Sequence, residues 1–148
     1  TAGSGVAVTN GAGSIAIRQK RPLYLTFCAG FTPSASGVDS AVLRIPDSPA
    51  DGTTGLTYNV RELFIRVETP SAGTSSVQVE YYTGTGAFSA TGNMMASALS
   101  ITGASTYESS TTSFSQTTLA SGNKVRLNFT ALDGTHTNFF IQLLLEEN

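Results

Sequence analysis

The chain has 148 residues and a formal net charge of −2, and only 12% of its residues are charged while 40% are hydrophobic. Eight basic against ten acidic residues leave no basic surplus for binding nucleic acid, and the sequence contains no run of about 20 apolar residues that could cross a membrane. The 18 Ser, 21 Thr and 15 Gly, together with few Glu and Lys, argue against a helical bundle and favour one all-β domain.

The first residues differ in composition from the rest of the chain. Residues 1–13 contain four Gly and no charge, which predicts a flexible N-terminal arm ahead of a single domain over residues 14–148. Val6 and Val8 alternate with small or polar residues and could form a short pairing strand. The arm is therefore either a frayed tail or a segment that orders against a neighbouring subunit, in which case Val6 and Val8 lie at the interface.

A basic cluster follows the arm. Ser14–Gln19 alternates like a strand, and Arg18, Lys20 and Arg21 place three of the eight basic residues within four positions, just before Pro22. One interpretation is a solvated strand end and turn. The other is a contact with an acidic partner surface, so these three residues are further interface candidates.

The next third of the sequence is rich in turn residues. Leu23–Cys28 is predicted to be a strand, whereas residues 30–59 contain most of the prolines and only one strand candidate, Ala41–Ile45. Asp47 and Asp51 lie near an Asp-Gly turn. They lack the further oxygen ligands and the closing Glu of a calcium loop, so we expect no metal there.

The strongest local pattern is a pair of alternating segments. Val60–Glu68 and Ser75–Thr83 flank a Pro/Gly turn and predict an antiparallel hairpin. The residues expected to face inward are Leu63, Ile65 and Val67 in the first segment and Val77, Val79 and Tyr81 in the second. Gln78, Glu80 and Tyr82 are expected to face outward.

Shorter strands follow. Strands are predicted at Gly84–Thr91, Leu99–Thr102, Tyr107–Phe114 and Asn123–Ala131, with a loop or a single helical turn at residues 93–98, and with Val125, Leu127 and Phe129 facing inward. About eight to ten short strands with regularly spaced turns predict an antiparallel β-sandwich or jelly roll.

The last predicted strand, residues 139–145 (FFIQLLL), is apolar on both faces. A strand buried on one side only would alternate. This strand is therefore either central and covered on both sides, or its outer face meets another subunit. We favour the second interpretation, which makes Phe140 and Leu144 interface candidates.

Catalytic and metal-binding patterns are absent from the sequence. The single cysteine, Cys28, excludes an intrachain disulfide and is expected to be a buried hydrophobe. The single histidine, His136, is expected to be exposed in a turn, because no Cys, Asp or second His is spaced to share a metal. Glu62 and Glu68 would lie about 20 Å apart along one strand, too far for a carboxylate pair. We expect no enzymatic activity and no cofactor.

The segment VRELFIRVETPSAGTSSVQVEYYTGTGAFSA and the closing strand NFFIQLLLEE resemble small jelly-roll structural proteins of tailed bacteriophages, of the type that decorates or cements capsids. The resemblance spans residues 58–146. It implies a non-enzymatic virion protein, a homotrimer that binds the major capsid protein on the capsid surface after synthesis in the host bacterial cytoplasm. From the charge balance and the lack of a long apolar run, we expect no nucleic-acid or membrane partner.

Two other functions remain open from the sequence. One is a tail, baseplate or fibre component of the same kind of particle. The other is a carbohydrate-binding sandwich, for which Tyr81, Tyr82, Phe88 and Tyr107 could supply an aromatic platform, although the chain contains no Trp. Thr1 is consistent with removal of an initiator Met, and a trimmed fragment is the alternative.

Overall fold

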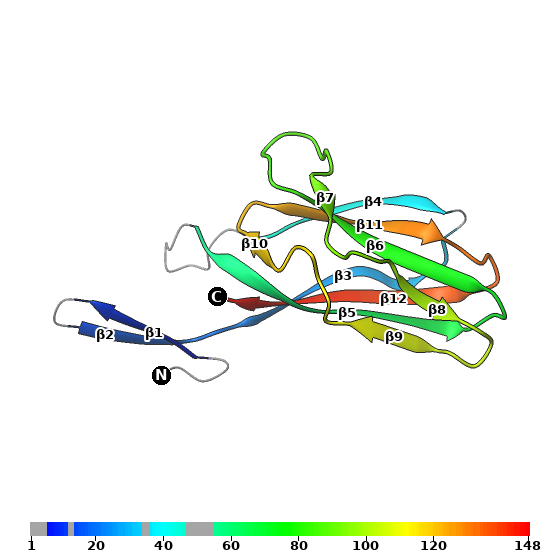
Figure 1. Ribbon diagram of the computed structural model, residues 1–148, viewed down its shortest axis with the longest axis horizontal. Coiled ribbons are helices and arrows are strands. Elements are labelled where there is room, and N and C mark those ends of the chain that lie inside the picture. Colours follow the sequence, from blue (N-terminus) through cyan, green and yellow to red (C-terminus); the bar gives the residue numbers. More distant parts are fainter. Residues whose placement is uncertain (1–5, 12–13, 34–35, 47–54) are drawn as a thin grey trace.

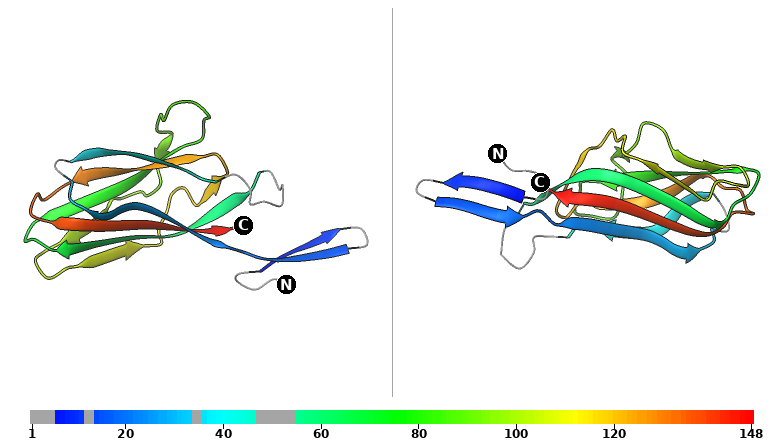
Figure 2. Two further views of the ribbon diagram at one scale, coloured as in Figure 1. Left: turned by 180° about the vertical axis from the view of Figure 1, so that it is seen from behind. Right: turned by 90° about the horizontal axis from the view of Figure 1, so that it is seen from below.

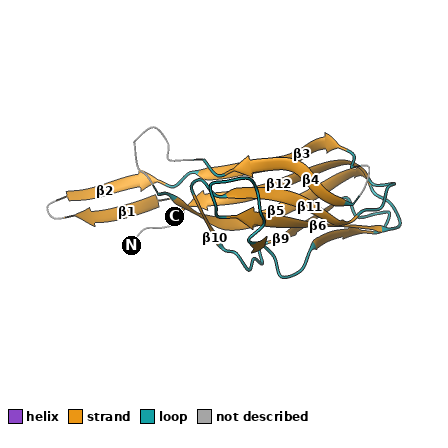
Figure 3. Ribbon diagram, turned by 90° about the horizontal axis from the view of Figure 1, so that it is seen from above, coloured by secondary structure: helices purple, strands orange, loops and turns teal. Residues whose placement is uncertain are grey.

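A computed structural model describes residues 6–11, 14–33, 36–46 and 55–148 (Figure 1). All regular secondary structure in these ranges is β-strand, which confirms the predicted all-β class (Figure 3). The strands are β1 (Val6–Gly11), β2 (Ser14–Gln19), β3 (Pro22–Phe31), β4 (Gly37–Arg44), β5 (Thr57–Thr69), β6 (Thr74–Tyr82), β7 (Gly92–Asn93), β8 (Leu99–Thr102), β9 (Glu108–Thr111), β10 (Thr118–Ala120), β11 (Lys124–Ala131) and β12 (Thr137–Glu147). No helix capable of spanning a membrane occurs in these ranges.

Ten of the strands form two antiparallel sheets that pack face to face as a β-sandwich (Figures 1 and 2). Sheet I has the order β10-β5-β12-β3, and β9 also pairs with β5. Sheet II has the order β4-β11-β6-β7, and β8 also pairs with β6. The predicted sandwich of about eight to ten strands is therefore confirmed.

The connections between the strands follow a jelly-roll arrangement. The chain changes sheets between β3 and β4, β4 and β5, β5 and β6, β8 and β9, β10 and β11, and β11 and β12. As a result β3, the first strand of the sandwich, lies beside β12, the last one. The two four-stranded orders β3-β12-β5-β9 and β4-β11-β6-β8 are those of a double-sheet jelly roll.

The core lies between the two sheets and is built from alternate residues of the long strands. The side chains predicted to face inward from β5, β6 and β11 are confirmed as core residues, and Tyr81 packs against them while partly exposed. The fully buried members from the four central strands are Leu63, Ile65, Val67, Val77, Val79, Val125, Leu127, Phe139, Ile141, Leu143 and Leu145. Each long strand therefore presents one apolar face to the opposite sheet.

The hairpin predicted from β5 and β6 is wrong. Both strands alternate and a tight turn at residues 70–73 joins them, but β5 pairs with β12, β9 and β10 in sheet I, whereas β6 pairs with β11, β7 and β8 in sheet II. The turn crosses the sandwich, and the apolar faces of the two strands meet across the core instead of lying side by side. Alternation reports which face is buried, and it does not report which strand is the hydrogen-bonding neighbour.

A β-bulge reverses the inward face of β5. Tyr58 and Val60 are buried before it, and Leu63 after it, so the spacing of buried residues changes by one. The pairing with β12 shifts at the same place, between Leu144 and Leu145. The extra residue, Arg61, points to the surface. Side chains from the segments on both sides of the bulge therefore reach the core.

Two other local predictions need correction. The strand expected at Gly84–Thr91 is a loop, and only Gly92–Asn93 pairs with β6. Gln78 was expected to face solvent but is only 4% exposed, because the segment after β7 lies against it. Its amide donates to the Met95 carbonyl (2.9 Å) and accepts the N–H groups of Met95 (3.2 Å) and Val79 (3.1 Å).

β1 and β2 form a two-stranded ribbon outside the sandwich. Among the described strands they pair only with each other, with Val6 opposite Gln19 and Gly11 opposite Ser14. The ribbon extends beyond the end of the sandwich where β12 finishes (Figures 1 and 3). Ser14–Gln19, assigned above to the sandwich domain, belongs to this projecting ribbon.

Candidate functional site

The outer face of sheet I carries an apolar patch. Phe140 and Leu144 of β12 point away from the core and are half-buried, while Phe64 lies beside them on β5 and Tyr24 on β3 is 55% exposed. Tyr24 lies directly opposite Leu144 in the sheet. These four residues, Tyr24, Phe64, Phe140 and Leu144, are called the apolar patch below.

The position of β12 bears on the two interpretations of this strand, which was predicted to be either covered on both faces or in contact with another subunit. The strand is central within its sheet, between β3 and β5, and its inner face is buried. Among the described elements no strand lies across its outer face, which Figure 2 (right) shows from below. Phe140 and Leu144 are therefore surface residues of this chain, and their contact with another subunit stays a prediction.

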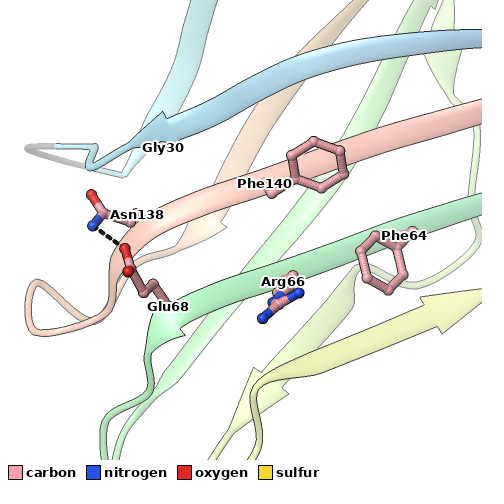
Figure 4. A pocket seen from close by; sticks show the side chains of 6 residues that line it. All are labelled: Gly30, Phe64, Arg66, Glu68, Asn138 and Phe140. Atoms are coloured by element: carbon pink, nitrogen blue, oxygen red, sulfur yellow. Dashed lines mark hydrogen bonds between the residues drawn. The ribbon is translucent and has the colours of Figure 1, made fainter.

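The apolar patch ends in a shallow groove of about 400 Å³ (Figure 4). Phe64 and Phe140 pack edge to face, with ring centroids 6.2 Å apart. Arg66 and Glu68 continue along β5 on the same side, and Asn138 lies across from them on β12 (Figure 4). The groove thus joins an aromatic pair to a guanidinium, a carboxylate and an amide.

Asn138 is held in a left-handed conformation at the end of this groove. Its φ is 54°, a value that Asn adopts more readily than most residues. Its backbone N–H donates to the Thr32 hydroxyl (3.0 Å), and its side-chain amide donates to the Glu68 carboxylate. Gly30, which also lines the groove, has a φ of 72°. These contacts fix the start of β12 against β3 and β5.

The outer face of sheet I is acidic on balance. Its charged residues on β5, β9 and β12 are Arg61, Glu62, Arg66, Glu68, Glu108 and Glu146. Arg61 forms an ion pair with Glu146. Within the described ranges, Glu62, Glu68 and Glu108 form no ion pair. Three carboxylates thus surround the apolar patch without a cationic partner.

The remaining interface candidates lie in or next to the ribbon. Val6 and Val8 fall in β1 and Arg18 in β2, and the description of these positions covers the backbone only. Lys20 is half-buried and Arg21 exposed in the short link to β3. The structure thus divides the candidates between two surfaces: the ribbon with its link, and the outer face of β12.

His136 was expected to be an exposed turn residue, and this prediction is wrong. Its side chain is fully buried, and Nδ1 lies 2.8 Å from the Ser75 hydroxyl. The same hydroxyl accepts the backbone N–H of Asp133 (3.0 Å), while the Asp133 carboxylate accepts from the Ser71 hydroxyl (2.6 Å). The turn before β12 therefore folds inward, and these hydrogen bonds hold it there. No motif in the local sequence predicts this network.

This network contains Ser, His and Asp but lacks the geometry of a catalytic triad. In a triad the carboxylate holds one imidazole nitrogen and the serine uses the other. Here Ser75 occupies Nδ1, and the Asp133 carboxylate contacts Ser71 and Thr135. Nε2 of His136 is buried without a hydrogen-bond partner. The cluster fastens the turn to β6.

The four aromatic residues considered for a sugar platform do not form one. Tyr81 packs against the core, and Tyr107 is exposed beside sheet I. Tyr82 and Phe88 lie together with centroids 5.8 Å apart, but Lys124 lies 5.6 Å from the Tyr82 ring and Arg126 lies 4.3 Å from the Phe88 ring. A cation therefore lies over one face of each of these two rings.

Metal and cysteine predictions are only partly covered by the structure. Asp47 and Asp51 lie outside the described residues. Across the ranges that are described, no three His, Cys, Asp or Glu side chains gather closely enough to share a metal ion. Cys28 lies in β3, and its side chain is outside the described part.

Comparisons of this chain with protein-family models, with curated proteins and with solved structures found no match.

Proposed function

We propose that this protein is a non-enzymatic structural subunit of a virion, which self-associates as a homo-oligomer, with a trimer favoured, and decorates a bacteriophage capsid by binding its major capsid protein. The observation that carries the proposal is the apolar patch on the outer face of sheet I. Contiguous apolar surface on a folded domain is typical of a protein–protein contact. The sequence resemblance supplies the kind of particle.

The ribbon supports an assembly role independently of the patch. A two-stranded hairpin is marginally stable by itself in water, yet β1 and β2 pair with no other described strand. A partner surface would supply the burial that such a ribbon lacks. A segment that orders on binding can cover a large partner surface.

The test is self-association together with particle binding. Purified full-length protein is expected to sediment as an oligomer and to co-sediment with capsid shells that lack it. Lysine substitution of Val42, which is 41% exposed on the other sheet, provides a control that should retain both properties. A strict monomer that does not bind capsids would refute the proposal. Gold labelling on the tail instead of the head would assign the protein to a tail, baseplate or fibre.

A further inference from the structure

We infer that the β1–β2 ribbon of one copy docks on the outer face of sheet I of a second copy, covering the apolar patch. The inference rests on the proposed self-association and adds to it which two surfaces meet. Four observations support it: the pattern of the ribbon, the direction in which it leaves the sandwich, the length of the ribbon relative to the patch, and their opposite charges.

The ribbon has one apolar face by its register. Val8 pairs with Ile17, and Ile15 pairs with Asn10, while Val6 lies two positions before Val8. Residues directly opposite in an antiparallel pair share a face, as do residues two apart in a strand. The positions of Val6, Val8, Ile15 and Ile17 therefore fall on the same side of the ribbon, with Asn10 and Gln19 at its two ends. The second side contains Ala, Thr, Ser, Gly and one Arg.

The link to β3 directs the ribbon away from its own sandwich. β2 ends at Gln19 and β3 begins at Pro22, so only two residues separate them. Arg21 precedes a proline, which disfavours the helical conformation and keeps this residue extended. The Arg21 carbonyl also accepts the Glu147 N–H (3.3 Å), which continues the pairing with β12 to this point. The ribbon thus points outward, where a second copy can receive it.

The ribbon is long enough to cover the patch. Each ribbon strand has six residues, whose five steps correspond to a length of about 17 Å. The outer face of β12 from Phe140 to Leu144 spans about 13 Å at the same rise per residue. Sheets that pack face to face lie about 10 Å apart and bury alternate side chains. Phe64, Phe140 and Leu144 are half-buried and Tyr24 is exposed, so a ribbon laid along β12 would cover all four.

The charges of the two surfaces are complementary. Lys20 and Arg21 lie at the base of the ribbon, in its link to β3, and Arg18 adds positive charge on the second side of the ribbon. The receiving face has Glu62 and Glu108, which form no ion pair among the described residues. Complementary charge fixes the register of an interface and accelerates its formation.

The test uses cysteine cross-linking between separate chains of the full-length protein. In a Cys28→Ser background, a Val8→Cys protein is mixed with a Leu144→Cys protein and oxidised, so that any disulfide between them joins two copies. We expect this pair to cross-link. The matched control replaces Leu144→Cys by Val42→Cys, on the outer face of sheet II, and is expected not to cross-link.

Charge reversal gives a second readout. Glu62→Lys with Glu108→Lys is expected to weaken self-association about tenfold, and adding Lys20→Glu with Arg21→Glu is expected to restore it. If the protein sediments as an oligomer but Val8→Cys fails to cross-link to Leu144→Cys, ribbon exchange is overturned and the proposed function stands. A disulfide formed only within one chain, in the Val8→Cys/Leu144→Cys double variant, also overturns exchange. A monomer at all concentrations overturns both.

Discussion

The Ser75 hydroxyl lies 2.8 Å from Nδ1 of His136, and both side chains are fully buried where β6 begins. Ser75 also accepts the N–H of Asp133 (3.0 Å), so one hydroxyl on β6 holds two residues of the turn that leads into β12. β12 supplies Phe140 and Leu144 of the apolar patch, and Asn138 near its start forms one end of the groove. The buried network therefore helps to position the strand that carries half of the apolar patch.

Removal of the Ser75 hydroxyl should destabilise the fold. In Ser75→Ala, the His136 imidazole and the Asp133 N–H lose a buried partner, and the free energy of unfolding is expected to fall by about 1–3 kcal/mol. Ser76→Ala is the matched control, because the Ser76 hydroxyl bonds Ser100 at the surface (2.7 Å), and it should cost less than about 0.5 kcal/mol. Urea unfolding measures both. Equal losses in the two variants would contradict a structural role for the network.

Asp133 should make stability depend on pH in the acid range. Hydrogen bonds from Ser71, and from the backbone and side chain of Thr135, hold the pKa of the Asp133 carboxyl well below its usual range. A lowered folded-state pKa stabilises the fold fully above the unfolded pKa of about 3.9, and this contribution is lost as the pH falls further.

The variant Asp133→Asn removes that dependence. The difference in melting temperature between the natural protein and Asp133→Asn is therefore expected to be largest above pH 5 and to shrink towards pH 2. Thermal unfolding followed by circular dichroism across this range measures it. A difference that stays constant over the whole range would show that the carboxylate charge is not involved.

The sequence predicted most of what depends on alternation and little of what depends on pairing. Leu63 and Val77 were placed correctly in the core, because a period of two reveals a buried face. Their strands were paired wrongly, because a tight turn can return a strand to its own sheet or carry it to the opposite one. A one-residue bulge at Arg61 was likewise invisible, since no residue type marks it.

Polar burial was the other limit of the sequence. The sequence indicated that both His136 and Gln78 are exposed. His136 is a polar residue in a predicted turn, and Gln78 alternates with the apolar residues of its strand. Both are buried because distant segments provide their partners: Ser75 is 61 positions from His136, and Met95 is 17 positions from Gln78. The two-sided apolar character of β12 was readable in full, and it led to Phe140 and Leu144, the residues now on the outer face of sheet I.

Adjacent leucines on β12 should respond differently to a charge. Leu143 is fully buried, whereas Leu144 is half-buried on the outer face of sheet I. Leu143→Lys is expected to unfold the domain, because an unpaired charge in the core is strongly disfavoured. Leu144→Lys is expected to keep the far-ultraviolet spectrum of the natural protein and to lose self-association in sedimentation. Unfolding of Leu144→Lys would place this face in the core instead.

Gln78 should matter more for stability than an exposed glutamine. Its amide is buried and makes three hydrogen bonds, two of which fasten Met95 to β6, while the third is with the neighbouring Val79 N–H. Gln78→Ala should lower the free energy of unfolding by about 1–3 kcal/mol. Gln142 is the control, because its amide makes one hydrogen bond, to the Thr26 hydroxyl, on the exposed outer face. Guanidinium unfolding should show a much smaller loss for Gln142→Ala, and the reverse order would contradict the burial of Gln78.

Deletion of residues 1–13 should separate folding from attachment. The deletion removes β1, which among the described strands pairs only with β2 and with neither sheet of the sandwich. The sandwich core is untouched, so the free energy of unfolding is expected to change by less than about 0.5 kcal/mol. Self-association and capsid co-sedimentation are expected to weaken, because the ribbon no longer forms. Unchanged attachment would mean that the arm is only a tail, and a large loss of stability would mean that the ribbon supports the sandwich itself.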